Sequence, residues 1–164
     1  MAKMVYGIVS GTPRYSVYAV PLAASQTFSP LSGRYIVRDD DVTGGNASLA
    51  TTTAAHLDGY VDGIFTSAAT AGGTKVPVVE NILDVVVEIP AYNATARETV
   101  TDAKIVHLLG ETLDTNVVSG VQYADIALST RQTLQVVGGS ATDNCLYVVA
   151  NPRPAAARDN ADIA

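Results

Sequence analysis

Residues 81–90 constrain the fold more than any other stretch, because they alternate with a period of two. One side of this extended chain carries only apolar side chains, from Leu83, Val85, Val87 and Ile89. The other side mixes apolar and acidic side chains, from Ile82, Asp84, Val86 and Glu88. β-branched residues at this period are typical of a strand with one face on a core and the other partly in water. Pro90 lacks a backbone N–H for the sheet and should end the strand.

Further strands are predicted along the chain, at residues 35–37, 60–61 continued by 64–65, 113–118, 121–128, 133–137 and 145–150. Ser119 and Gly120 stand between two of them like a tight hairpin turn, and residues 138–144 form a longer hairpin loop. The strand 145–150 is apolar on both faces, so we expect it to be central or covered in its sheet.

One short helix is predicted at residues 102–109. Thr99 followed by Asp102 fits an N-terminal capping pattern, and Gly110 is a natural C-terminal stop. Ala103, Val106 and Leu109 give an apolar helical stripe. The alternate residues of the same segment could also form one face of a strand, so this assignment has a competing interpretation.

The predicted fold class is therefore mainly β, a small β-barrel or β-sandwich module or modules with one short helix and an extended N-terminal arm. We divide the chain into residues 1–30, a first β module at 31–95, a second at 96–150, and a mobile C-terminal tail at 151–164. The boundary near residue 95 follows a change of pattern that suggests a hinge. The tail has almost nothing apolar to bury.

Residues 1–30 are either a partner-grasping arm or a first edge strand, since regularly spaced prolines keep the chain extended and out of central strands. A strand-like piece lies at residues 15–20. Tyrosine buries an apolar ring while its hydroxyl finds a partner, which is useful at interfaces. The interface hypothesis therefore names Tyr15, Val17, Tyr18, Val20 and Phe28.

Charge limits the possible partners. Only 16% of residues are charged, against about 25% in an ordinary globular domain, and the net charge is −6. Phosphate binding draws on clustered Lys and Arg, so we expect no nucleic-acid partner. We also expect no membrane span and see no signal-peptide pattern.

The sequence lacks the residue sets of common active sites. Cys145 is the single cysteine, and its apolar neighbours suggest a buried thiol. His56 and His107 have no second ligand at metal-binding spacing. The Asp-rich residues 39–46 could bind Ca²⁺, but they lack the alternating ligand spacing and fit a solvated turn better. Residues 72–75 lack the spacing of a phosphate-binding loop. We expect no catalytic residues, no metal and no cofactor.

A family resemblance rests on several motifs that together cover about two-thirds of the chain. The first part runs Ser48-Leu-Ala-Thr-Thr-Thr-Ala-Ala-His-Leu-Asp-Gly-Tyr-Val-Asp-Gly63, then a glycine loop, then Lys75-Val-Pro-Val-Val79 and Val87-Glu-Ile-Pro90. It resembles the small β module of tailed-phage head decoration (capsid cement) proteins. The downstream motifs are similar to phage virion structural proteins: Gly110-Glu-Thr-Leu-Asp-Thr115, Ala127-Leu-Ser-Thr-Arg131, Leu134-Gln-Val-Val-Gly-Gly139 and Val148-Val-Ala-Asn-Pro152.

The resemblance implies a non-enzymatic subunit that is made in the host cytoplasm and binds the outside of an assembled phage head. Its partner would be the major capsid protein, and it would act as a homo-oligomer, a dimer or trimer on a symmetry axis. Two alternatives remain open. One is another virion β protein, from the tail, neck or fibre base, and the other is a glycan- or surface-binding module.

Overall fold

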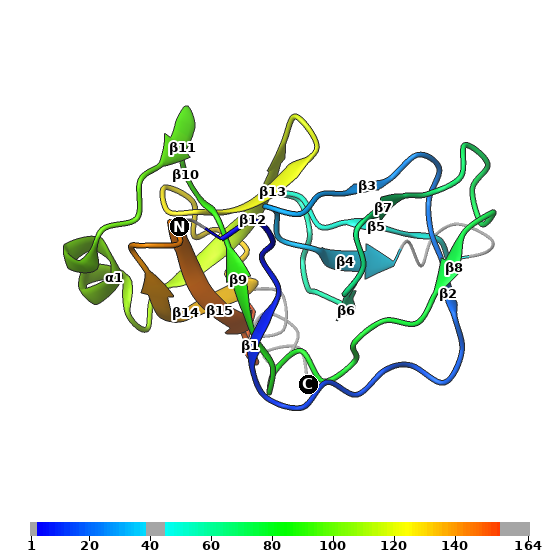
Figure 1. Ribbon diagram of the computed structural model, residues 1–164, viewed down its shortest axis with the longest axis horizontal. Helices are drawn as coiled ribbons and strands as arrows, with labels where there is room; N and C mark the ends of the chain where they lie inside the picture. Colours follow the sequence, from blue (N-terminus) through cyan, green and yellow to red (C-terminus); the bar gives the residue numbers. More distant parts are fainter. Residues whose placement is uncertain (1–2, 39–44, 155–164) are drawn as a thin grey trace, which may run out of the picture.

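Strands account for most of the regular structure in the computed structural model, which describes residues 3–38 and 45–154 (Figure 1). Several sheets and one short helix make up a β-sandwich-like fold. The predicted fold class, mainly β with one short helix, is confirmed. Within the described ranges no sheet closes into a barrel, so the sandwich is the alternative that fits.

The largest sheet has eight strands in the order β1-β9-β15-β14-β12-β13-β10-β11. Neighbours are antiparallel except β10 and β13, which run parallel. The bounds are β1 (Ile8–Ser10), β9 (Val86–Ile89), β10 (Ala91–Asn93), β11 (Ala96–Glu98), β12 (Thr112–Val118), β13 (Val121–Asp125), β14 (Leu134–Ser140) and β15 (Cys145–Ala150).

Two sequence predictions about this sheet are confirmed. Strand β15 lies between β9 and β14, and its side chains alternate between fully and partly buried. Ser119 and Gly120 join β12 to β13 with φ values of 51° and 78°. Two consecutive positive φ angles are the signature of the tight hairpin turn whose twist matches that of the strands.

The remaining strands of the described residues form three smaller sheets. One is β5 (Ala47–Leu49), β4 (Tyr35–Arg38) and β6 (Gly59–Tyr60), in that order. The others pair β2 (Val20–Pro21) with β8 (Lys75–Val76) and β3 (Thr27–Phe28) with β7 (Phe65–Thr66). The single strand predicted across residues 60–65 was wrong, because the intervening Asp62-Gly63 separates β6 and β7 and they join different sheets.

The β4–β6 layer lies between two hydrophobic cores. Tyr35 and Tyr60 pack into the larger core, against the eight-stranded sheet. The next residues along the chain, Ile36 and Val61, pack into the smaller core with Phe28 and Leu49. Adjacent side chains on a strand point to opposite faces. Consecutive apolar residues in these short strands therefore fill both cores. The layer joins the two parts of the molecule, namely the part built on the eight-stranded sheet and the part that surrounds the smaller core.

Gln122 of β13 connects this layer to the large sheet through buried hydrogen bonds. Its Oε1 accepts from the backbone N–H of Tyr35 at 2.9 Å, and its Nε2 donates to the carbonyls of Tyr35 at 2.8 Å and Ala50 at 3.0 Å. The backbone N–H of Gly33 donates to the Gln122 carbonyl at 2.9 Å. Gln122 is fully buried, so these bonds are shielded from water.

The alternating stretch at residues 81–90 forms a shorter strand than predicted. Residues 82–84 make a turn, closed by a hydrogen bond from the Asp84 N–H to the Asn81 carbonyl, and Leu83 is 52% exposed. Glu88 was expected to face water partly, and this was wrong. The side chain is 1% exposed; it forms an ion pair with Lys3 at 2.8 Å and accepts a hydrogen bond from the Gly7 N–H at 3.2 Å.

The helix α1 (Asp102–Leu108) exists as predicted, but its cap and its buried face were wrong. The capping side chain belongs to Thr101, which accepts a hydrogen bond from the Lys104 N–H. Leu108 is buried, and the partly buried Ile105 packs against the larger core. Ala103, Val106 and Leu109 are exposed. The sequence holds two apolar stripes at helical spacing, and only the sheet beneath decides which one is covered.

The N-terminal residues, described from Lys3 onward, run extended along the rest of the molecule (Figure 1). β1 is an edge strand of the large sheet. Tyr6 is buried, its N–H donates to Pro30 and its carbonyl accepts from the Arg34 guanidinium at 2.8 Å. Within residues 3–30 the chain is thus fastened to the body of the protein over much of its length.

The sheets also cross the predicted boundary between modules. β9 and β10 precede residue 96, yet they pair with β15 and β13, which follow it. Of the predicted C-terminal tail, residues 155–164 lie outside the described ranges. Asn151 is held in place, because its N–H donates to the Thr133 carbonyl and its side-chain amide to the Gln132 carbonyl.

Candidate interaction surfaces

The first candidate surface is a bend at residues 15–20, which we call the tip. Val17 is 93% exposed and Tyr18 is 85% exposed, the two highest values among the large apolar side chains of the described residues. Tyr15 is about half-exposed at 45%. Val20 is partly buried in β2, where it packs against the smaller core. The structure therefore brings four of the five predicted interface residues together on one segment.

Phe28, the fifth residue of the interface hypothesis, lies away from the exposed tip and is buried. Its side chain is 1% exposed and packs against Phe65, with ring centroids 5.1 Å apart. A ring that is already buried in the monomer offers no area to a partner. Phe28 could not be separated from the tip by pattern, because both lie in the same proline-spaced segment.

The tip is held firmly on both sides. The Ser16 N–H donates to the Val78 carbonyl at 2.8 Å, and the Ser16 hydroxyl donates to the Tyr18 carbonyl at 2.8 Å across the bend. On the far side Val20 pairs with Val76. A segment fixed in this way loses little conformational entropy when a partner covers it.

Tyr15 adds an anchor through its side chain. Its hydroxyl donates to the Asp62 carboxylate at 2.8 Å, and this hydrogen bond raises the pKa of Tyr15. The Tyr15 side chain is therefore held in place, and its hydroxyl group has a hydrogen-bond partner.

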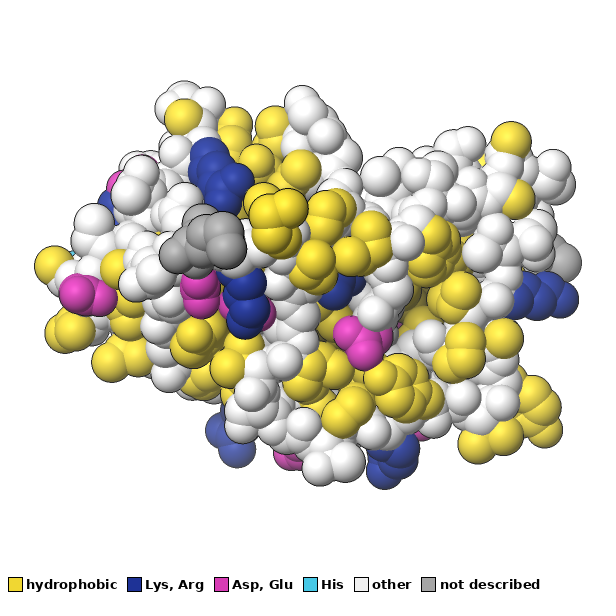
Figure 2. Space-filling view, viewed as in Figure 1, with side chains coloured by type: hydrophobic (Ala, Val, Ile, Leu, Met, Phe, Trp, Pro, Cys, Tyr) yellow, Lys and Arg dark blue, Asp and Glu magenta, His cyan; other side chains and the backbone are white. Residues whose placement is uncertain are grey.

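The second candidate surface is the exposed stripe of α1, formed by Ala103, Val106 and Leu109. Val106 is 71% exposed and Leu109 is 51% exposed. Figure 1 places α1 and β2, the strand that follows the tip, at opposite ends of the long axis. Figure 2 shows hydrophobic side chains on the surface towards both ends. The tip and the α1 stripe thus lie towards opposite ends of the molecule, among further exposed apolar side chains such as Met4 and Leu83.

The edges of the large sheet are poorly suited to pairing with another chain. β1 and β11 have three residues each, and the register of β1 shifts between Ile8 and Ser10. β11 carries the charged residues Arg97 and Glu98. Short, interrupted or charged edge strands protect native sheets against edge-to-edge association. We therefore expect partners to meet side-chain surfaces and not a free sheet edge.

The buried ionisable groups have structural surroundings. Cys145 is fully buried as predicted, and burial, together with the Glu88 carboxylate 3.6 Å away, raises its pKa to about 12. A thiol with a raised pKa is a poor nucleophile. Burial also raises the pKa of Tyr60 to about 12 and that of Tyr35 well above its usual value.

Arg34 is a buried charge that the sequence did not reveal. It is 2% exposed, donates to the carbonyls of Val61 and Tyr6 at 2.9 and 2.8 Å, and lies 5.4 Å from the centre of the Tyr60 ring. Carbonyl oxygens and an aromatic face compensate the guanidinium in place of a carboxylate. Arg34 therefore ties the N-terminal segment to the end of β6.

Metal and membrane features can be assessed for residues 3–38 and 45–154. These ranges hold no cluster of three or more His, Cys, Asp or Glu side chains able to bind a metal ion. His56 pairs with Asp58 at 3.2 Å. Residues 39–44 of the Asp-rich turn lie outside the described part. In that same part, no helix combines the length and hydropathy of a transmembrane segment.

Comparisons with protein-family models, with curated proteins and with solved structures found no match to this chain.

Proposed function

We propose that this protein is a non-enzymatic virion structural protein, a decoration subunit that binds the outer surface of a phage head and stabilises it. Its partner is the major capsid protein. The resemblance of residues 48–90 and of the downstream motifs to phage decoration and virion proteins supports the class of protein. The two apolar surfaces support a role in adhesion.

The observation that carries the proposal is the position of these surfaces at opposite ends of the long axis. A subunit with one adhesive surface can only attach, whereas a subunit with two can bridge neighbouring capsid proteins. Burying one large apolar side chain stabilises a contact by about 1.5–3 kcal/mol. Each contact is then modest, and many copies on a repeating lattice bind strongly through multivalency.

A symmetric lattice also favours homo-oligomers with closed symmetry, so a dimer or trimer on a symmetry axis is part of the proposal. The net charge of −6 is compatible with a position on the outer face, away from packaged DNA.

Mass spectrometry of purified mature particles tests the proposal. We expect the protein among the structural proteins of the particle, and immunogold labelling should mark heads. Labelling of tails, necks or fibre bases would favour the alternative virion role. Particles that lack the protein, while it is abundant and free in the lysate, would contradict both.

Removing residues 1–30 would not test the tip, because the described part of this segment includes the buried side chains Tyr6, Leu22 and Phe28. Their loss opens the cores and unfolds the protein. Substitutions at the exposed Val17 and Tyr18 separate binding from folding, since surface changes usually alter stability by no more than about 0.5 kcal/mol.

A further inference from the structure

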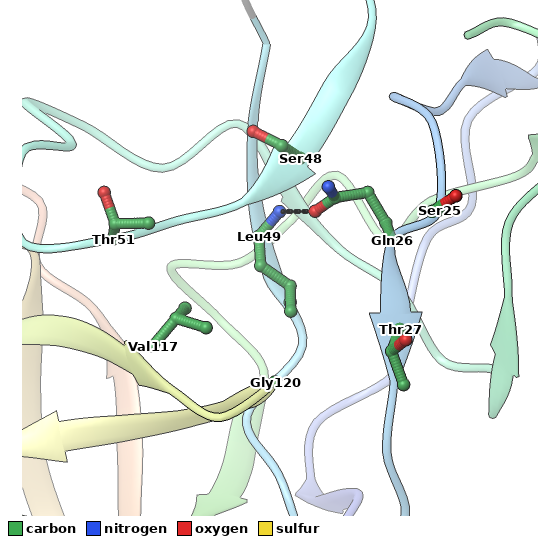
Figure 3. A pocket seen from close by; sticks show the side chains of 8 residues that line it. All are labelled: Ser25, Gln26, Thr27, Ser48, Leu49, Thr51, Val117 and Gly120. Atoms are coloured by element: carbon green, nitrogen blue, oxygen red, sulfur yellow. Dashed lines mark hydrogen bonds between the residues drawn. The ribbon is translucent and has the colours of Figure 1, made fainter. Parts of the chain in front are cut away.

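A neutral polar hollow lies where the two parts of the molecule meet. Its walls come from residues 25–27, from Ser48, Leu49 and Thr51 in and after β5, and from Val117 and Gly120 of the β12–β13 hairpin (Figure 3). Its volume is about 390 Å³. Small-molecule sites typically measure about 300–1,000 Å³ and often lie between structural units.

The chemistry of the walls selects a class of ligand. The side chains that line the hollow carry hydroxyl, amide or aliphatic groups, and none of these lining residues is ionisable. Phosphates and carboxylates are normally bound by Arg or Lys, and Ca²⁺ or Mg²⁺ by carboxylates. The hollow therefore suits a neutral ligand that makes many hydrogen bonds.

One wall is apolar. Leu49 is 6% exposed and belongs to the smaller core, and Val117 packs against the same core from β12. A pyranose ring combines an aliphatic C–H face with a rim of hydroxyl groups. Such a ring matches a hollow with an aliphatic patch beside hydroxyls and an amide.

Gln26 lines this space and is held in place by two hydrogen bonds. Its Oε1 accepts from the Leu49 N–H at 3.0 Å, and its backbone N–H donates to the Ser67 hydroxyl at 2.7 Å. No described residue accepts a hydrogen bond from its Nε2. Figure 3 shows the amide oxygen of Gln26 joined to the backbone nitrogen of Leu49. The side chain is thus fixed by its oxygen and leaves two N–H donors for a ligand.

The backbone at the rim is also fixed in an unfavourable conformation. Ser25 has a φ of 52°, and its N–H donates to the Ala68 carbonyl at 2.9 Å. A non-glycine residue with positive φ costs on the order of 1 kcal/mol, and such residues cluster at ligand sites.

A peptide is a poorer candidate than a sugar. An extended peptide binds by adding a strand to an open edge. Here β5 already lies between β4 and the chain at Leu22 and Ala23, and the Ala23 N–H donates to the Ala47 carbonyl. β3 pairs with β7 on one edge and has only two residues, so it offers little ladder to a peptide backbone.

We propose that this hollow binds a neutral glycan, with the Gln26 Nε2 and the Ser48 hydroxyl as hydrogen-bonding groups and the half-buried Val117 beneath the ring. The site is separate from the tip and from the α1 stripe. It would give the protein a binding activity in addition to the proposed structural role, and either can fail without the other.

The test uses the full chain and four neutral sugars, namely glucose, galactose, mannose and N-acetylglucosamine, each titrated by two-dimensional ¹H–¹⁵N NMR. We expect at least one of them to shift the side-chain amide signals of Gln26 and the backbone amide of Leu49. The dissociation constant should be on the order of millimolar, as for a shallow site with few contacts. Glucuronate serves as a charged control and should bind no more tightly.

Gln26→Glu keeps the oxygen that accepts from Leu49 and removes the Nε2 donors. We expect it to weaken binding by roughly two- to tenfold, the effect of losing about one hydrogen bond. Gln135→Glu on β14, away from the hollow, is the matched control and should bind as the wild type does. Ser48→Ala gives a second test should Gln26→Glu misfold.

Two results would overturn the proposal. One is the absence of any shift at Gln26 and Leu49 with all four neutral sugars. The other is binding that stays unchanged in both Gln26→Glu and Ser48→Ala.

Discussion

Replacing Gln122 with methionine removes the buried amide that joins the two parts of the protein while keeping the length of the side chain. Three hydrogen bonds are lost. The Tyr35 carbonyl retains a bond from the Ala50 N–H at 3.0 Å. The Tyr35 N–H and the Ala50 carbonyl lose the partner that Gln122 gave them, in fully buried surroundings.

Each buried polar group left without a partner costs about 1–3 kcal/mol, so we expect Gln122→Met to lower the free energy of unfolding by about 2–6 kcal/mol. This is a large part of the roughly 5–15 kcal/mol that stabilises a typical domain. Urea unfolding followed by circular dichroism measures the loss.

Gln135→Met is the control. Gln135 lies half-buried on β14, and its side chain donates to no group in the described ranges. We expect that change to alter stability by no more than about 0.5 kcal/mol. Equal stability of the two variants would refute the view that the Gln122 hydrogen bonds hold the β4–β6 layer to the large sheet.

Three further predictions concern stability. Because burial raises the pKa of Tyr60 and of Cys145 to about 12, the folded protein holds these protons more tightly than the unfolded chain. The contribution of these two groups to the free energy of unfolding should therefore be fully present below about pH 9. It should be lost as pH rises towards 12, by about 2–3 kcal/mol for Tyr60 alone. Urea midpoints across this range test it, and Tyr60→Phe should flatten the fall. Thr101→Ala should cost about 1 kcal/mol of stability as a lost helix cap, whereas Thr99→Ala should cost little in the same urea assay; the reverse order would contradict the observed cap. Gly33→Ala should lower the melting temperature markedly, because an added Cβ would lie 2.5 and 2.6 Å from atoms of two buried side chains; unchanged melting would show that the site relaxes freely.

The sequence was sufficient where the pattern is local. Ser119-Gly120 predicted its turn because two positive φ angles favour such residues. Strand β15 was expected to be covered because it is apolar on both faces, and it lies inside its sheet. These features depend on neighbours in the chain, which the sequence displays directly.

Features that depend on distant segments could not be predicted. The alternating pattern places Glu88 on a solvent-facing side, but the side chain is buried and bonded to Lys3, 85 residues earlier in the chain. The exposed face of α1 was chosen by the sheet, through Ile105 and Leu108. Gln122 and Arg34 looked like ordinary polar residues, since most of their partners lie far away in sequence.

The exposure of the residues in the interface hypothesis differs from one to the next, and the interface itself stays a prediction. Tyr15, Val17 and Tyr18 stood out as aromatic and β-branched residues in a proline-spaced segment, and they are exposed. The same reasoning included Phe28, which the smaller core buries. The apolar stripe of α1 was recognised, but its exposure was not, because the sheet covers Ile105 and Leu108 instead. The hollow beside Gln26 was missed, because it exists only once several segments have folded together.

Negative-stain microscopy of empty phage shells from the same lysate, mixed with purified protein, tests the central claim most directly. Wild-type protein and Leu83→Ser, a change at an exposed apolar residue outside both surfaces, should coat the shells. The double variant Val17→Ser, Tyr18→Ser should fold normally and coat them more weakly, because only the α1 stripe is left to attach it. Bare shells with the wild type, or equal coating by all three proteins, would contradict the claim that this chain adheres to a capsid through its tip.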